Sequence, residues 1–107
     1  MSLRTQVASA RYELTGTPTP AEAAFVEGWS AFRAGLLAKA IEAFGDASRL
    51  DPAGPLAEDA RYWRAVALTR AGAPSAPAEL AAFLRRHPHS AHAAEAAWLL
   101  EATKRAR

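Results

Sequence analysis

The chain of 107 residues contains no cysteine, which excludes disulfides and thiol chemistry. It also lacks any run approaching the ~18 apolar residues of a membrane-spanning helix. No segment has the alternating pattern of a β-strand. The net charge is only +2, which argues against a nucleic-acid partner even though residues 55–107 carry eight basic and five acidic groups. These absences leave an all-α domain as the expected fold class.

The N-terminal segment has no apolar core or cleavage site of a signal peptide. We therefore expect a cytoplasmic protein as the chain is written, or a periplasmic one if it was excised from a longer exported protein. Leu3, Val7 and Leu14 recur at helical spacing, and the Pro- and Thr-rich run that follows breaks any helix. Residues 1–19 are thus predicted to form an N-terminal helix or arm and a linker.

The strongest signal is a repeat between Pro52 and Pro88, which stand 36 positions apart and each follow an alanine-rich helical segment. Alanine supplies 29 residues, so helices can approach closely. A self-similar period of this size is typical of a helical solenoid. We predict one domain over residues 20–107, with a first helical pair in 20–53, a second in 54–88 and a final helix in 90–105.

Local signals predict where the helices begin and end. Thr19 is a suitable N-cap, Pro20 suits the first helical position, and Glu22 completes a capping box. Gly35 and Gly72 can end the first and third helices in the left-handed conformation. The first three helices are expected at about 20–34, at 37–50 and from Gly54-Pro55 to about 71. The fourth is expected after residue 77, with Leu80, Phe83 and Leu84 on its apolar face. The fifth is expected to follow Ser90, which would be its N-cap.

These features resemble tetratricopeptide (TPR) repeats, which are helix-turn-helix units of about 34 residues. In the first unit Gly28 takes the small-residue position, Ala40 and Ala47 the close-packing alanines, and Phe44 the aromatic of the second helix. The second unit departs from the pattern, since Arg64 stands where the family prefers leucine. The run 60–65 resembles a bacterial envelope subclass, typified by the Tol-Pal coordinator and outer-membrane assembly lipoproteins. The resemblance implies a right-handed solenoid of about two and a half repeats that holds a peptide or helix in a concave groove.

The repeat register places equivalent residues of the first, third and fifth helices on one face. Each helix then offers acidic, aromatic and apolar side chains, and the first two also offer an arginine. The predicted partner-binding groove consists of Phe25, Trp29, Phe32, Arg33, Asp59, Tyr62, Val66, Arg70 and Trp98. A plainer interpretation also fits, in which the aromatics are ordinary core and the charges solvate the helix ends.

Phe25, Trp29 and Phe32 form a narrow stripe of the first helix. Aromatic side chains bury roughly 150 to 250 Å² each, so three left in water would match or exceed the roughly 300 to 600 Å² of a typical monomer's largest apolar patch. We therefore expect the stripe to be covered by the N-terminal segment, by a second copy of the chain or by a partner.

The rotation of the third helix is open from the sequence. The repeat register points Tyr62 and Val66 into the groove, whereas counting back from Pro88 puts Trp63 in the core. We favour Trp63 buried and Tyr62 partly exposed, because Trp63 belongs to an apolar stripe with Leu56, Ala60 and Ala67.

His87, His89 and His92 cluster, and Glu95 follows one turn after His92, so a zinc site has to be considered. A solvent-facing loop stiffened by Pro88 fits the same residues, and we predict no metal and no cofactor. No phosphate-binding loop or nucleophile elbow occurs, and we predict no catalytic site.

The sequence therefore predicts a protein-interaction scaffold rather than an enzyme, with a protein or peptide partner. The alternative is a structural or oligomerisation domain of a larger bacterial envelope or regulatory protein, whose aromatic face is covered by a second copy or a neighbouring domain.

Overall fold

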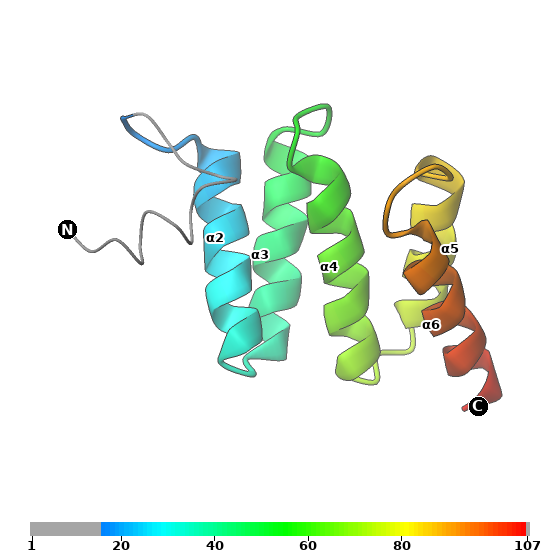
Figure 1. The fold of residues 1–107 in the computed structure, drawn as a ribbon. Coiled ribbons are helices and arrows are strands. Elements are labelled where there is room, and N and C mark those ends of the chain that lie inside the picture. The colour runs from blue at the N-terminus through cyan, green and yellow to red at the C-terminus, as the bar shows by residue number, and fades with distance from the viewer. Residues whose placement is uncertain (1–15, 107) are drawn as a thin grey trace.

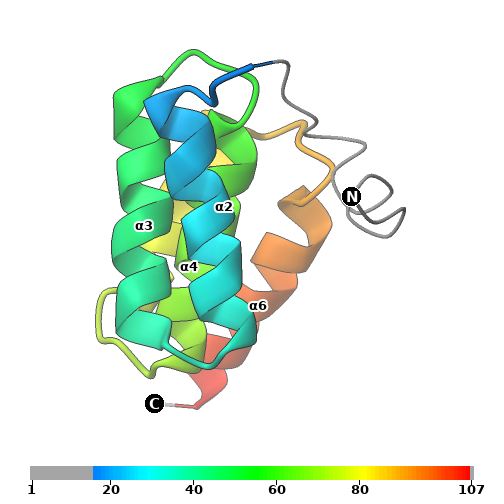
Figure 2. The same cartoon turned by 90° about the vertical axis from the view of Figure 1, so that its left-hand side faces the viewer.

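A computed structural model describes residues 16–106, which form five α-helices and no strand (Figure 1). Consecutive helices run in opposite directions and pack on one another. When the molecule is viewed from the α2 side, α3 and α6 lie on opposite sides of it (Figure 2). The helices are α2 (Pro20–Arg33), α3 (Leu37–Leu50), α4 (Ala57–Arg70), α5 (Ala76–Arg86) and α6 (Ala93–Arg105). The predicted all-α class and the five predicted helices are confirmed.

The predicted helix ends are confirmed where the sequence carries a specific signal. The Thr19 N–H donates to Glu22 Oε1 at 2.8 Å, and the Glu22 N–H donates to Thr19 Oγ1 at 3.1 Å, which completes the capping box. Gly35 and Gly72 take φ values of 79° and 69°, in the left-handed region that glycine adopts without strain.

Two helix starts lie later than predicted. α4 begins at Ala57 rather than at Gly54-Pro55, because the intervening residues form turns. α6 begins at Ala93 with His92 as its N-cap, so the assignment of Ser90 to that position is wrong. Ser90 instead accepts a hydrogen bond at 3.0 Å from the His92 N–H, through its side chain, in the turn before the helix.

The core is one continuous cluster that extends along all five helices. Phe25, Phe44 and Leu80 are its largest fully buried side chains. Gly28 lets α2 and α3 approach closely, since a Cβ atom there would lie only 2.7 Å from Cδ1 of Phe44. Small residues therefore set the helix spacing, and a few large rings fill what remains.

The favoured rotation of α4 is wrong. Tyr62 is 4% exposed and belongs to the core, whereas Trp63 is only half-buried. The reason is that α4 is enclosed on several sides, with the four consecutive residues 65–68 all buried. A helix buried around much of its circumference has no single apolar stripe that determines its rotation.

Two of the three aromatic rings of the α2 stripe are buried. Phe25 is 1% exposed and Phe32 is 9% exposed. Phe44 of α3 contacts both rings edge-on, and Trp63 of α4 contacts Phe32. Phe44 and Trp63 thus cover part of these two rings from within residues 16–106, and cover by a second copy or a partner stays a prediction. The predicted N-terminal helix over residues 1–14 lies outside the described residues.

Candidate partner-binding groove

Two tryptophans meet where α2 and α4 lie side by side. The ring centroids of Trp29 and Trp63 are 4.7 Å apart, with the ring planes inclined by 59°. Both side chains are half-buried, so each has one edge in the core and another at the surface. Amphipathic aromatic rings held in this way provide rigid contact area for a partner.

A surface groove of about 410 Å³ continues from Trp63 towards α6. Val66 and Arg70 line it from α4, and Glu95 and Leu99 line it from α6. The groove is open because α6 packs mainly on α5 and touches α4 only lightly. Apolar walls with a few charged groups are the usual composition of a binding groove.

Two arginines lie against the aromatic rings on the α2 side. The guanidinium carbon of Arg33 is 5.9 Å from the centroid of the Trp29 ring, and that of Arg70 is 4.8 Å from the centroid of the Phe32 ring. Both arginines are exposed. Cation–π contacts of this kind hold the side chains in place while the charge remains available to an acidic group.

Trp98 is the most exposed large apolar residue among those described, with 60% of its surface in solvent. It lies on α6 one turn after Glu95, which lines the groove. Residues three apart on a helix are neighbours on its surface, so Trp98 stands at the rim of the groove. The groove therefore has a half-buried tryptophan on its α4 side and an exposed tryptophan on its α6 side.

Eight of the nine predicted groove residues fall into two groups by burial. Phe25, Phe32, Tyr62 and Val66 are each less than 10% exposed and form the layer beneath the surface. Trp29, Arg33, Arg70 and Trp98 reach solvent. Phe25 and Tyr62 were both predicted as groove residues; both rings are buried, and of these two only Tyr62 lines the groove.

Sequence reasoning missed Trp63 as a surface residue because it was assigned to the core. It also left Leu99 unassigned. The repeat register did not put Trp63 in the core, since it pointed Tyr62 and Val66 into the groove and left Trp63 about 100° away. The apolar stripe was favoured over the repeat register, and it predicted the wrong rotation of α4.

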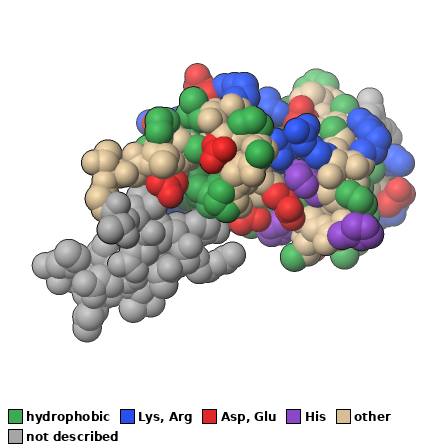
Figure 3. Space-filling model, turned by 90° about the horizontal axis from the view of Figure 1, so that it is seen from above, with side chains coloured by type: hydrophobic (Ala, Val, Ile, Leu, Met, Phe, Trp, Pro, Cys, Tyr) green, Lys and Arg blue, Asp and Glu red, His purple; other side chains and the backbone are tan. Residues whose placement is uncertain are grey.

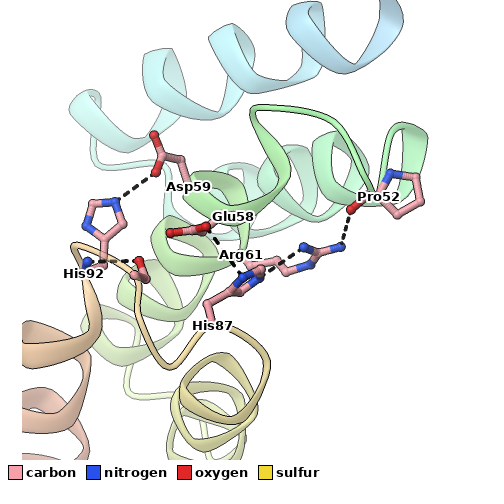
Figure 4. A network of polar contacts seen from close by, with 7 residues as sticks. Pro52, Glu58, Asp59, Arg61, His87 and His92 are labelled. Carbon is pink, nitrogen blue, oxygen red and sulfur yellow. Dashed lines mark hydrogen bonds and ion pairs between the residues drawn. The ribbon is translucent and has the colours of Figure 1, made fainter.

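Asp59, the remaining predicted groove residue, joins α4 to the start of α6. His92 Nε2 lies 3.0 Å from Asp59 Oδ1 (Figure 4). The His92 ring also stacks on Tyr62, with centroids 4.1 Å apart and planes within 4°. Burial, and after it the charge of Glu95, raises the pKa of the Tyr62 hydroxyl. Asp59 and His92 thus link α4 to the start of α6 beside Tyr62, which lines the groove.

His87 makes a separate set of contacts at the same end of the molecule (Figure 4). Its Nδ1 is 3.6 Å from Glu58 Oε1, and its Nε2 is 3.2 Å from Nη1 of Arg61. Burial lowers the pKa of His87, Glu58 opposes that change, and the positive charges of Arg61 and Arg86 add to it. A neutral ring that accepts a hydrogen bond from Arg61 fits this environment.

Of the three histidines predicted as possible zinc ligands, His87 and His92 pair individually with residues of α4, and His89 is exposed. Among residues 16–106, no group of three or more His, Cys, Asp or Glu side chains is placed to hold a metal ion. Across the same residues, none of the helices is long and apolar enough to cross a membrane.

Comparisons of the chain with protein-family models, with curated proteins and with solved structures find no match. The role of the groove is therefore argued from its own residues.

Proposed function

We propose that this chain is a protein-interaction module that holds a segment of a partner protein in the groove between α4 and α6 and against Trp29 of α2, which contacts Trp63. The observation that carries the proposal is the exposure of Trp98, at 60%, on the α6 side of a groove that Trp63 lines from α4. Tryptophan and arginine are the residues most often found to dominate binding energy at protein interfaces. All three tryptophans of the chain belong to this one surface.

The chemistry of the groove favours a particular kind of segment. Apolar side chains of the segment would cover Trp63 and Leu99, and an acidic group would reach Arg33 or Arg70. A basic group at the other end would face Glu95. We therefore propose an amphipathic helix or extended peptide with aliphatic anchors and charges of both signs.

A TPR-like arrangement of the helices is part of the same proposal. Three features support it: each helix packs chiefly on its sequence neighbours, Gly28 lies against Phe44, and both Ala40 and Ala47 are buried. In the second unit Ala65 and Leu80 are fully buried at the corresponding depth. Stacked helix pairs of this type expose the first helix of each pair along one face, which is where the tryptophans lie.

Affinity capture from the source cell tests the proposal with a matched pair of variants. Trp98→Ala should reduce recovery of the partner about tenfold or more, because a tryptophan anchor that becomes buried in an interface contributes about 2 kcal/mol or more. Leu50→Ala is the control, since Leu50 is similarly exposed, at 56%, and lies on α3 outside the groove. If both variants reduced partner recovery equally, or if neither reduced it, the result would contradict binding in the groove.

Self-association is the second candidate, favoured by the same exposed Trp98. Light scattering separates the two. A homodimer through this face predicts that the wild-type chain has twice the monomer mass and that Trp98→Ala returns it to the monomer mass. A heterologous groove predicts a monomer in both cases.

A further inference from the structure

A second concave site lies between α3, α4 and α5, on the opposite side of α4 from the groove. It is a cavity of about 620 Å³. Five arginines from the three helices line it: Arg49, Arg61, Arg64, Arg85 and Arg86. Glu79 is the one acid among its described lining residues. In the view from above, basic side chains gather beside the histidines at the α5 end of the molecule (Figure 3).

The cavity exists because α3 and α5 both pack on α4 and leave space between them. Gly45 forms part of the wall on α3, and the lack of a side chain there lets two arginines approach. A Cβ atom at Gly45 would lie 3.2 Å from Nε of Arg64 and 3.2 Å from Nη1 of Arg49. The small residue thus allows guanidinium groups of two helices to converge on one space.

Two of the five arginines are neutralised within the chain. Arg64 Nη1 is 2.8 Å from Glu79 Oε1, in a pair whose side chains are 31% and 40% exposed. Arg49 pairs with Asp46, one turn earlier on the same helix. Both pairs retain access to solvent, so both can exchange partners at small cost.

The other three arginines have no acidic partner within hydrogen-bond distance in the described residues. Arg61 donates to the carbonyl oxygen of Pro52 at 3.0 Å and to the ring of His87, and both of these acceptors are uncharged there. The side chains of Arg85 and Arg86 make no ion pair or hydrogen bond within residues 16–106, and both are exposed. The cavity therefore carries an excess of about three positive charges.

Repulsion between these positive charges affects the pKa of Arg61. Burial lowers the pKa of Arg61 first, and the positive charge of Arg86 lowers it further, although Glu58 opposes both effects. Arg61 stays protonated all the same. An anion placed among the guanidinium groups would relieve this repulsion.

We propose that this cavity binds a small molecule that bears a phosphate or diphosphate group. Arginine presents a planar fork of donors that matches phosphate oxygens, and several converging forks suit a group with two or more negative charges. A single carboxylate would leave most of the positive charge unpaired. The volume is in the range of small-molecule sites, and Phe83 and Ala82 supply an apolar wall for the organic part.

The placement of the arginines distinguishes this ligand from nucleic acid. Strands are held by basic groups distributed along a stripe that follows the backbone, with exposed aromatic rings on which bases stack. Here the basic groups converge on one cavity, and its aromatic residue, Phe83, is 3% exposed.

Isothermal titration of the full chain with sodium pyrophosphate, at constant ionic strength, tests the proposal. We expect saturable binding at a single site. Arg85→Gln/Arg86→Gln should weaken that binding about tenfold or more, because it removes the two cations that have no partner. Lys39→Gln/Arg105→Gln is the matched control: it removes the same charge from exposed positions outside the lining and should change affinity by no more than about twofold.

Glu79→Gln provides a test in the opposite direction. It removes the acid that competes for Arg64, so we expect pyrophosphate to bind several-fold more tightly, a gain that a merely structural role of Glu79 does not explain.

Four results would overturn the proposal. The first is the absence of saturable heat at millimolar pyrophosphate, and the second is an equal loss of pyrophosphate affinity in the two double variants. The third is tighter binding of hexaglutamate than of pyrophosphate. The fourth is binding of a single-stranded oligonucleotide that pyrophosphate does not displace.

Discussion

At the scale of single residues, Gly28 and Gly45 lie inside helices, and a methyl group added at the two positions would meet different surroundings. A Cβ atom at Gly28 would meet the ring of Phe44, which is fully buried and cannot move aside. A Cβ atom at Gly45 would meet only the outer parts of arginine side chains, which are flexible. The two positions therefore separate a rigid contact from an adjustable one.

Gly28→Ala should lower the free energy of unfolding. Overpacking a core costs about 1 to 3 kcal/mol, whereas the better helix propensity of alanine contributes only about 0.5 to 1 kcal/mol. Gly45→Ala should leave stability unchanged or raise it by up to about 1 kcal/mol, since its helix gain is not offset by a clash. Urea unfolding of both variants beside wild type measures the difference. A stabilised Gly28→Ala protein would show that α2 and α3 are not in close contact.

His87 should make stability depend on pH. Its pKa is lowered in the folded chain from 6.5, chiefly by burial, so the unfolded chain binds a proton more readily. The contribution of His87 to stability is therefore present above about pH 6.5 and is lost as the pH falls towards its folded pKa. Urea unfolding of wild type and His87→Gln at about pH 7.5 and about pH 5.5 isolates this contribution, and we expect the smaller decrease in the variant. Equal decreases would contradict the assigned environment.

At the scale of helices, the ends were predictable wherever a residue has a specific backbone role. Thr19 and Glu22 form the capping box, and Gly35 and Gly72 take positive φ values, because these roles depend on local sequence. The start of α6 was not predictable, since His92 occupies the N-cap without a capping side-chain bond and instead stacks on Tyr62. A long-range contact decides where that helix begins.

Thr19 and Ser75 are both N-cap residues with a hydroxyl group, but only Thr19 makes a side-chain capping bond, so the two positions give a matched test of that bond. Thr19→Ala should lower the free energy of unfolding by about 0.5 to 2 kcal/mol, because it removes the acceptor for the Glu22 N–H. Ser75→Ala, at the N-cap of α5, should change it by less than about 0.5 kcal/mol, since Ser75 makes no side-chain capping bond. Thermal unfolding monitored by circular dichroism is sufficient, and equal losses would argue against the capping box.

At the scale of the whole molecule, the groove and the arginine-lined cavity lie on different sides of α4. The sequence predicted the first of these in part. It named Trp29, Arg33, Arg70 and Trp98, which all reach solvent, but it could not show that Phe25 and Tyr62 are buried, since burial depends on tertiary packing. The cavity was not predicted at all, because its arginines come from three helices and converge only in space.

Separation of the two sites implies that they can be disabled one at a time. Trp98→Ala should leave pyrophosphate affinity within about twofold of wild type, and Arg85→Gln/Arg86→Gln should leave partner recovery within the same range. Titration calorimetry and affinity capture on the same protein preparations check both statements. Loss of both activities in either variant would instead indicate a general loss of folding.

The central claim, that a partner segment lies across Trp29, Trp63 and Trp98, is tested most directly by the indole N–H signals of the chain in a two-dimensional ¹H–¹⁵N spectrum. The chain has three tryptophans, so three such signals are expected. On addition of the captured segment, the account predicts that all three shift while the side-chain N–H signals of Arg85 and Arg86 stay in place. Unmoved indole signals with a bound segment would contradict it.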